Sequence, residues 1–259
     1  MQPLVIWLGL VVATGLIALS GGRRPLVDAW PAYLFALPLA TRIWRLFGTQ
    51  TGPATISPHE VADLLQQIVF IGFFGLLVAL FAIRSPVSGA RATPAQGLVA
   101  LVGTFVINVA GFVPTDPSTS TVTLLASSLI VFAGTAFAVW SLAILGRCFG
   151  IFPEVRGLVL RGPYRWVRHP VYLGEIVSGV GVLIARPHPL TLGLLATFVV
   201  FQYWRTIFEE RALMAAFASE YTAYRALVPR LAPGLGWRIF WKPSQVPTGT
   251  AALARPDAP

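Results

Sequence analysis

Apolar residues run in long segments along most of the chain, and polar residues gather in the short stretches between them. A helix that crosses a bilayer needs about 20 consecutive, mainly apolar residues. Runs near that length occupy residues 4–20, 30–47, 61–83, 96–113, 122–145 and 189–208, and a shorter run occupies residues 171–185. The pattern predicts an all-α fold: a polytopic integral membrane bundle of about five to seven transmembrane helices.

Composition also favours a membrane protein, because only 11% of the 259 residues are charged and 56% are hydrophobic. A soluble domain carries about a quarter charged residues. Nineteen basic residues against ten acidic ones give a net charge of +9. The bases lie mainly beside and after apolar runs, so we expect a lipid bilayer rather than nucleic acid as the partner. Cys148 is the only cysteine, which excludes an intrachain disulfide and a cysteine metal cage, and we expect no metal site.

The charges that flank each run predict the sidedness of the chain. Residues 4–20 have their bases after them, which favours an uncleaved span with its N-terminus outside. The densest basic segment, residues 147–168, is expected in the cytoplasm, and the Arg-rich, Lys-poor composition is typical of a bacterial inner membrane protein. Residues 30–47 break this scheme, because alternation puts Arg42 and Arg45 on the outer side. Either this run is re-entrant or the N-terminal count of spans is off by one.

The last two apolar runs, residues 171–185 and 189–208, are separated by a short turn that contains Pro187 and Pro189. If both flanks of this pair are cytoplasmic, the runs form a helical hairpin whose two ends meet. Residues 209–227 then alternate apolar and charged residues at helical spacing, which predicts an amphipathic helix at the membrane surface.

The chain accordingly divides into three parts. Residues 1–145 hold the N-terminal transmembrane helices, residues 146–242 hold the hairpin with its polar flanks, and residues 243–259 form a disordered tail. Polar groups are costly in a bilayer, so their concentration on the two flanks is informative. We expect the flanks to meet in a cleft that is half in water and half in lipid, which suits one soluble and one lipophilic reactant.

The polar flanks carry a set of short motifs. They are Gly162-Pro163-Tyr164, Arg168-His169-Pro170 followed by Tyr172 and Gly174, Glu209-Glu210, Glu220-Tyr221 and Tyr224-Arg225. Over residues 157–233 the chain thereby resembles the isoprenylcysteine carboxyl methyltransferase family, which belongs to a wider group with phospholipid N-methyltransferases and thiol S-methyltransferases. The resemblance implies S-adenosylmethionine as methyl donor, bound on the cytosolic side, and a lipophilic acceptor that enters from the membrane.

The resemblance also implies a set of site residues. The donor-binding candidates are Gly162, Pro163, Tyr164, Arg168, His169, Pro170, Tyr172, Gly174 and Glu210, and the catalytic candidates are Arg205 and Glu209. These residue types suit the donor, because its ammonium needs a carboxylate and its carboxylate needs Arg or backbone N–H groups. The sulfonium favours aromatic faces, and glycines permit close approach of the backbone.

Methyl transfer from a sulfonium is an in-line displacement that loses charge, so it needs positioning and desolvation more than acid or base groups. For a carboxylate acceptor, as in the prenylcysteine enzymes, we expect Arg205 to be the orienting cation. For an amine or thiol acceptor, deprotonation is required, and Glu209, Glu210 or His169 are the candidate bases. The choice between the two glutamates is open. The acceptor is open too, since the N-terminal half carries no prenyl-recognition motif.

Simpler roles compete with these assignments. Arg165 and Arg168 can anchor the chain to lipid phosphates, and the aromatic side chains can form a belt at the membrane interface. Arg205 lies four residues before Glu209, so a plain ion pair on a helix surface is a rival role. Two different functions also compete. One is a membrane reductase with a nicotinamide cofactor, although no dinucleotide-type glycine loop is visible, and the other is a non-catalytic membrane component of the same fold.

Overall fold

A computed structural model describes residues 3–20, 30–48, 58–84, 92–114, 116 and 118–232 of the chain. Its helices are α1 (Pro3–Ser20), α3 (Trp30–Gly48), α4 (Pro58–Ile83), α5 (Pro94–Phe105), α6 (Thr121–Leu145), α7 (Pro170–Ala185), α8 (Pro189–Ala216) and α9 (Ala218–Leu227), with 3-10 turns η1 (Val106–Phe112), η2 (Gly146–Cys148) and η3 (Gly162–Arg165). These residues contain no strand, which confirms the predicted all-α fold. The tail predicted at residues 243–259 lies outside the described residues.

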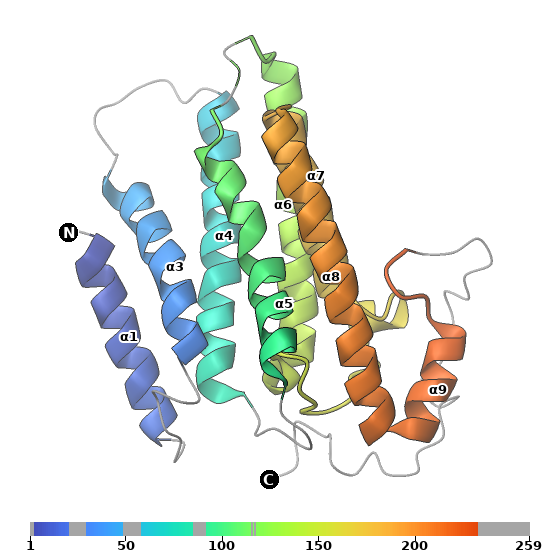
Figure 1. Ribbon diagram of the computed structural model, residues 1–259. Helices are drawn as coiled ribbons and strands as arrows, with labels where there is room; N and C mark the ends of the chain where they lie inside the picture. The colour runs from blue at the N-terminus through green and yellow to red at the C-terminus, as the bar shows by residue number, and fades with distance from the viewer. Residues whose placement is uncertain are drawn as a thin grey trace.

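The helices stand side by side in one bundle, with α1 at one edge and α9 at the opposite edge (Figure 1). Helix α3 packs between α1 and α4, α6 packs against α4 and most extensively against α7, and α5 packs on α8. Helices α4 and α6 end at the same end of the bundle, where Arg147 Nε donates a hydrogen bond to the carbonyl oxygen of Ile83 at 3.1 Å. The connection from α6 to α7 lies at this end, so the basic segment of the sequence gathers there.

Two helices in the described part of the chain are long and apolar enough to cross a membrane, namely Thr121–Cys148, which extends α6, and α8. The other apolar helices are shorter, and the run at residues 96–113 is divided between α5 and η1. Apolar side chains also point outward, since Leu16 is 61%, Leu98 63% and Leu129 66% exposed. A surface of this kind favours contact with lipid. The number of crossing helices and their sidedness stay predictions.

A cluster of phenylalanine rings holds α3, α4 and α5 together. The ring of Phe35 lies 5.9 Å from that of Phe81 and 5.5 Å from that of Phe105, and Phe81 meets Phe149 edge to face at 5.2 Å. Phe149 and Ile151 are buried in the same cluster. Because burial of each aromatic ring contributes about 1.5–3 kcal/mol, the start of the connection after α6 is firmly fixed to the core.

Helix α8 is longer than the sequence pattern predicted. We expected a span over residues 189–208 and a separate surface helix over residues 209–227, but the break falls at Phe217. The predicted boundary was wrong because the change from apolar to charged residues does not end a helix. The eight residues before Phe217 are Glu, Arg, Ala, Leu and Met, which are all good helix formers. Glu209 and Glu210 therefore lie on the same continuous helix as the apolar part of α8.

Helices α6 and α7 meet backbone to backbone at glycines. A Cβ on Gly134 would lie 2.6 Å from both the carbonyl oxygen of Gly174 and the backbone nitrogen of Ser178. We expect Gly134→Ala to lower the free energy of unfolding by about 1–3 kcal/mol, because backbone atoms cannot move aside as a flexible side chain does. Gly193→Ala on α8 is the matched control, since nothing lies within 4 Å of its Cβ position, and it should be neutral or stabilising. Thermal unfolding in detergent measures both variants, and equal midpoints would contradict the close contact.

Candidate functional site

A cavity of about 780 Å³ lies between the helices and extends from the polar end of the bundle into its apolar interior. Its polar wall includes Tyr164, Arg168, His169, Tyr172, Glu175, Arg205 and Glu209, and its apolar wall includes Phe70, Phe73, Phe74, Leu77, Val131 and Val182. Pockets of about 300–1,000 Å³ hold small organic ligands. The cavity therefore has space for a polar ligand at one end and a hydrocarbon chain beyond it.

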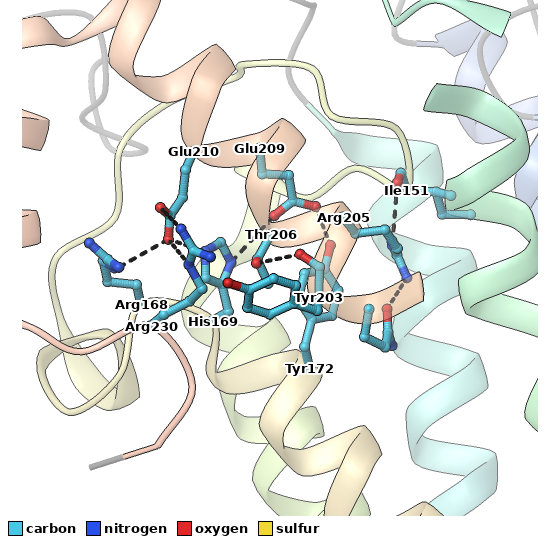
Figure 2. A network of polar contacts seen from close by, with 11 residues as sticks. Ile151, Arg168, His169, Tyr172, Tyr203, Arg205, Thr206, Glu209, Glu210 and Arg230 are labelled. Carbon is cyan, nitrogen blue, oxygen red and sulfur yellow. Dashed lines mark hydrogen bonds and ion pairs between the residues drawn. The ribbon is translucent and has the colours of Figure 1, made fainter. Parts of the chain in front are cut away.

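The two flanks of the α7–α8 hairpin meet at the polar end of this cavity, as the sequence led us to expect (Figure 2). His169, at the start of α7, has its Nε2 3.1 Å from Oε1 of Glu210 and its Nδ1 3.6 Å from Oε2 of Glu209. The hydroxyl of Tyr172 donates a hydrogen bond to Oε1 of Glu209. The rings of His169 and Tyr172 stack with their centroids 5.7 Å apart. One histidine thus joins two neighbouring glutamates that point in different directions.

His169 holds its proton more tightly than an ordinary histidine. Burial lowers its pKa, but the hydrogen bonds and negative charges of Glu209 and Glu210 outweigh burial and leave the pKa above its usual value. In the protonated ring both nitrogens donate, so both carboxylates are satisfied. Because the folded pKa is raised, the stability from these contacts is complete below the ordinary pKa of histidine and is lost as the pH rises through the raised value.

Glu210 is the centre of a buried ion cluster. Arg230 donates to it from two nitrogens, Nε to Oε1 at 3.0 Å and Nη2 to Oε2 at 2.8 Å, and Nη2 of Arg168 lies 3.2 Å from Oε1. Backbone hydrogen bonds join the same segments, from Arg168 N to Pro229 O at 2.9 Å and from His169 N to Arg230 O at 3.1 Å. The cluster therefore fastens the segment after α9 to the start of α7. Glu210 thus contributes to holding the site together, and its predicted role in donor binding stays a prediction.

Arg205 is buried on the cavity wall with 6% of its surface exposed. Its Nη1 donates to Oε1 of Gln202 at 2.9 Å and to Oγ1 of Thr104 at 3.2 Å, and its Nη2 donates to the carbonyl oxygen of Ile151 at 3.3 Å. The guanidinium carbon lies 4.6 Å from the centroid of the Tyr172 ring. Buried Nε has no hydrogen-bond partner among the described residues. The side chain is therefore held rigidly by α5, α8 and the connection after α6.

The structure places six of the sequence-derived candidates on the cavity wall. They are Tyr164, Arg168, His169, Tyr172, Arg205 and Glu209. Glu209, rather than Glu210, is the glutamate on the wall, and its side chain is 24% exposed. The rival role of Arg205 in a surface ion pair does not fit, because Arg205 is buried and Glu209 contacts Tyr172 and His169 instead.

Four further candidates lie beside the wall, and the fold accounts for each of them. Gly162 adopts φ +59° at the start of η3, where a Cβ would also lie 3.2 Å from Ile144. Pro163 and Pro170 lie in the first turns of η3 and α7, where proline is favoured. Gly174 is the glycine of the contact with α6. A direct role for these residues in donor binding stays a prediction.

Sequence reasoning did not single out several residues of the site. Glu175, three residues after Tyr172, lines the cavity and accepts a hydrogen bond from Nε2 of Gln202. A carboxylate inside an apolar run was an available signal, because such groups are costly in a membrane. Nothing in the pattern pointed to Thr104, which reaches the site from a distant part of the chain. Arg230 ends the second polar segment of the sequence, but no role was predicted for it.

Arg42 also belongs to the cavity wall. Its guanidinium carbon lies 4.5 Å from the centroid of the Phe70 ring, and α3 is a helix throughout Trp30–Gly48. The side chain is turned into the bundle, where an aromatic face attracts its charge. The structure thus turns this charge toward the cavity, and whether residues 30–47 are re-entrant stays a prediction.

Comparison with known proteins bears on this arrangement. Residues 122–220, from the first turn of α6 to the first turn of α9, match the family described as phospholipid methyltransferase. Over this segment, the chain is similar to that family. No curated protein matches the chain.

The methyltransferase segment agrees with the resemblance found in the motifs, at the level of the wider group of methyltransferases. It contains α6, α7 and α8 and with them both halves of the polar site, His169 and Tyr172 on one side and Arg205 to Glu210 on the other. It also contains both helices that are long and apolar enough to cross a membrane, in agreement with a membrane-associated methyltransferase. Thr104 and Arg230 lie outside the matched residues.

Proposed function

We propose that the protein is an integral membrane methyltransferase that uses S-adenosylmethionine and acts on a lipophilic or small acceptor. One observation carries the proposal: Glu209, His169 and Tyr172 lie together at the polar end of a cavity that continues into the apolar interior, within the segment that matches methyltransferases. The polar end suits a charged donor, and the apolar part suits the hydrocarbon portion of an acceptor.

The residues at the polar end fit the donor. The carboxylate of Glu209 lies on the wall and keeps unused acceptor capacity beside the contacts from Tyr172 and His169, so it can bind an ammonium group. The rings of Tyr164, Tyr172 and Tyr221 line the same cavity and offer faces to a cation. When bound, the donor supplies a methyl group on a positively charged sulfur, and the sulfur becomes neutral on transfer.

The protein contributes positioning and exclusion of water. Three hydrogen bonds fix the guanidinium of Arg205 before any ligand arrives, so no energy is spent on reorienting it during the reaction. Tyr172 lies between Arg205 and Glu209, in contact with both, and so fixes their separation. The surrounding helices keep water from the reacting atoms, which favours a displacement that loses charge.

We also propose that the polar end faces the cytoplasm of a bacterial inner membrane. Several bases gather at this end, among them Arg147, Arg156, Arg161 and Arg165, in accordance with the charge rule for cytoplasmic loops. Sealed vesicles test the orientation. Donor added outside should be used by inside-out vesicles and not by right-side-out ones.

Calorimetry on the purified protein tests the proposed function. We expect binding of S-adenosylmethionine and of its demethylated product, weaker binding in Glu209→Gln, and none of a reduced nicotinamide dinucleotide. Binding of the nicotinamide instead would favour a membrane reductase, and binding of neither compound would favour a non-catalytic component. Incubation of membranes with methyl-labelled donor then identifies the acceptor as the labelled lipid, peptide or volatile product.

A further inference from the structure

A further carboxylate, that of Glu175, lies on the cavity wall one helical turn beyond Tyr172, and no step described above uses it. We propose that Glu175 takes the proton from the methyl acceptor, and that the acceptor is therefore an amine or a thiol rather than a carboxylate. The inference rests on the proposed function and deepens it by naming a base and the chemistry of the acceptor.

Glu175 is held in place by the side chain of Gln202. Nε2 of Gln202 donates to its Oε2, and Oε1 of Gln202 accepts from Nη1 of Arg205 at 2.9 Å. Gln202 is fully buried, so its amide is a fixed bridge between the carboxylate and the guanidinium. Among the described residues, the hydrogen bond from Gln202 reaches Oε2 of Glu175, and none is found to its other oxygen. Glu175 is thus oriented by one oxygen and has the other available for a ligand.

Glu175 also differs from the neighbouring glutamates in its ion pairing. Glu154 and Glu210 are each locked in an ion pair with arginine, at 3.0 Å and 2.8 Å. Glu175 forms no ion pair within 4.0 Å among the described residues, and the positive charge of Arg205 acts on it from farther away and through the Gln202 bridge. A carboxylate locked in an ion pair is a poor base, because protonation would break the pair. Glu175 is not locked in such a pair, so it can accept a proton without breaking one.

The side chains of α7 that line the cavity become less polar along the helix. Beyond Glu175 on α7 lie Ser178, whose hydroxyl is 3.1 Å from that of Thr135 on α6, and then Val182, and all of them line the cavity. Successive turns of α7 therefore present a carboxylate, a hydroxyl and an apolar side chain to the cavity. A ligand with a polar head and a hydrocarbon tail fits this order, with its head beside Glu175.

The same geometry disfavours a carboxylate acceptor. The charged groups on the cavity wall near Glu175 are Arg205 and Glu209 of α8. The other polar groups there are uncharged hydroxyls, of Tyr172 on α7, Thr104 on α5 and Thr135 on α6. The charge of Arg205 is already countered by Glu175, and Glu209 adds a further negative charge. An acceptor carboxylate would meet repulsion here, whereas an N–H or S–H group can donate to the unused oxygen.

Atoms and charges balance in the proposed step. An N–H bond of the acceptor in its ammonium form, or the S–H bond of its thiol, breaks, and the proton goes to the other oxygen of Glu175, which leaves a neutral amine or a thiolate. The electron pair left on nitrogen or sulfur forms the new bond to the methyl carbon. The bond from that carbon to the donor sulfur breaks with its electron pair going to sulfur, which becomes a neutral thioether. Glu175 then returns its proton to water.

Three probes with the same twelve-carbon tail test the inference: dodecylamine, dodecane-1-thiol and dodecanoic acid. With methyl-labelled donor, we expect methylation of the amine or the thiol and not of the acid. Glu175→Gln keeps the size and the contact with Gln202 and should lower this turnover about 100-fold at neutral pH, in line with the loss of a general base. Its remaining activity should rise with pH, because the acceptor then loses its proton without help. Donor binding by calorimetry should be unchanged.

Asp116→Asn is the matched control, since it makes the same acid-to-amide change at an exposed turn outside the cavity. Thermal unfolding checks that Glu175→Gln is folded. If it is not, Glu175→Asp decides, because a shortened base lowers the rate and keeps the pH profile, whereas an unchanged rate would overturn the inference. Preference for dodecanoic acid, full turnover in Glu175→Gln, or methylation of none of the probes while the donor binds would each overturn it as well. Absence of donor binding in the unaltered protein would instead overturn the proposed function.

Discussion

Arg205→Ala is expected to reduce methyl transfer by about 100-fold or more, as seen when a preorganised charged or polar group is removed from a reacting centre. Arg205 lies on the cavity wall, ties Thr104, Gln202 and the Ile151 carbonyl together, and covers the ring of Tyr172. Its removal leaves these groups without their common partner. Donor binding should fall much less, because Glu209 and His169 are not bonded to Arg205. Turnover with methyl-labelled donor and calorimetry with the demethylated product separate the two effects.

Two further variants serve as comparisons for the turnover of Arg205→Ala. Arg205→Lys keeps the charge but cannot form the same set of hydrogen bonds, so its turnover should fall between those of Arg205→Ala and the unaltered protein. Arg211→Ala removes an exposed arginine from the same helix and should leave turnover unchanged. Full turnover in Arg205→Ala would remove Arg205 from the mechanism.

Glu210→Ala is expected to destabilise the fold, whereas Glu209→Ala is expected to weaken donor binding. Glu210 is 6% exposed and contacts Arg168, His169 and Arg230, so its removal leaves buried positive groups without a partner. Breaking a buried ion pair in this way costs about 3–5 kcal/mol, and we expect the lower end because the side chain of Arg230 is 25% exposed. The backbone amides of Arg168 and His169 should then exchange hydrogen faster, since the cluster helps to hold the segment that carries their partners, Pro229 and Arg230.

Glu209→Ala is the natural comparison, because it removes the same group from the adjacent position. Its carboxylate is 24% exposed, so the midpoint of thermal unfolding should fall less than in Glu210→Ala. Calorimetry with S-adenosylmethionine should show the opposite order at a temperature where both variants are folded. A larger loss of stability in Glu209→Ala, or stronger donor binding there than in Glu210→Ala, would contradict the assignment of the two glutamates.

The meeting of the two polar flanks was predictable from the sequence. A hairpin brings its ends together whatever the details of its packing, so motifs at residues 162–174 and 205–210 had to meet once the two apolar runs were paired. Arg205 and His169 were identified by the resemblance of their motifs to the methyltransferase family, and their places at the ends of apolar runs agree with a functional role. The match over residues 122–220 supports the resemblance on which these assignments rested.

Which of Glu209 and Glu210 lines the cavity was not predictable from the sequence. Successive residues of a helix project about 100° apart, so the two side chains point in different directions, and only the packing of α8 decides which of them lines the cavity. The length of α8 depended on helix formers rather than on the change of polarity at Glu209. Thr104 joins the site from α5, 101 residues before Arg205, and no local pattern encodes such a contact.

The backbone contact of α6 with α7 has a consequence for turnover. Gly134, Gly174 and Gly181 bring the backbones of these two helices into close contact, so that side of the cavity has little room to widen. We expect a bulky molecule to leave through another side, for example past Phe70 and Phe74 of α4. Aromatic rings can swing aside without breaking hydrogen bonds, and product departure is the slow step in many enzymes. The pace of catalysis would then be set by motion of these rings rather than by the chemistry at the polar end.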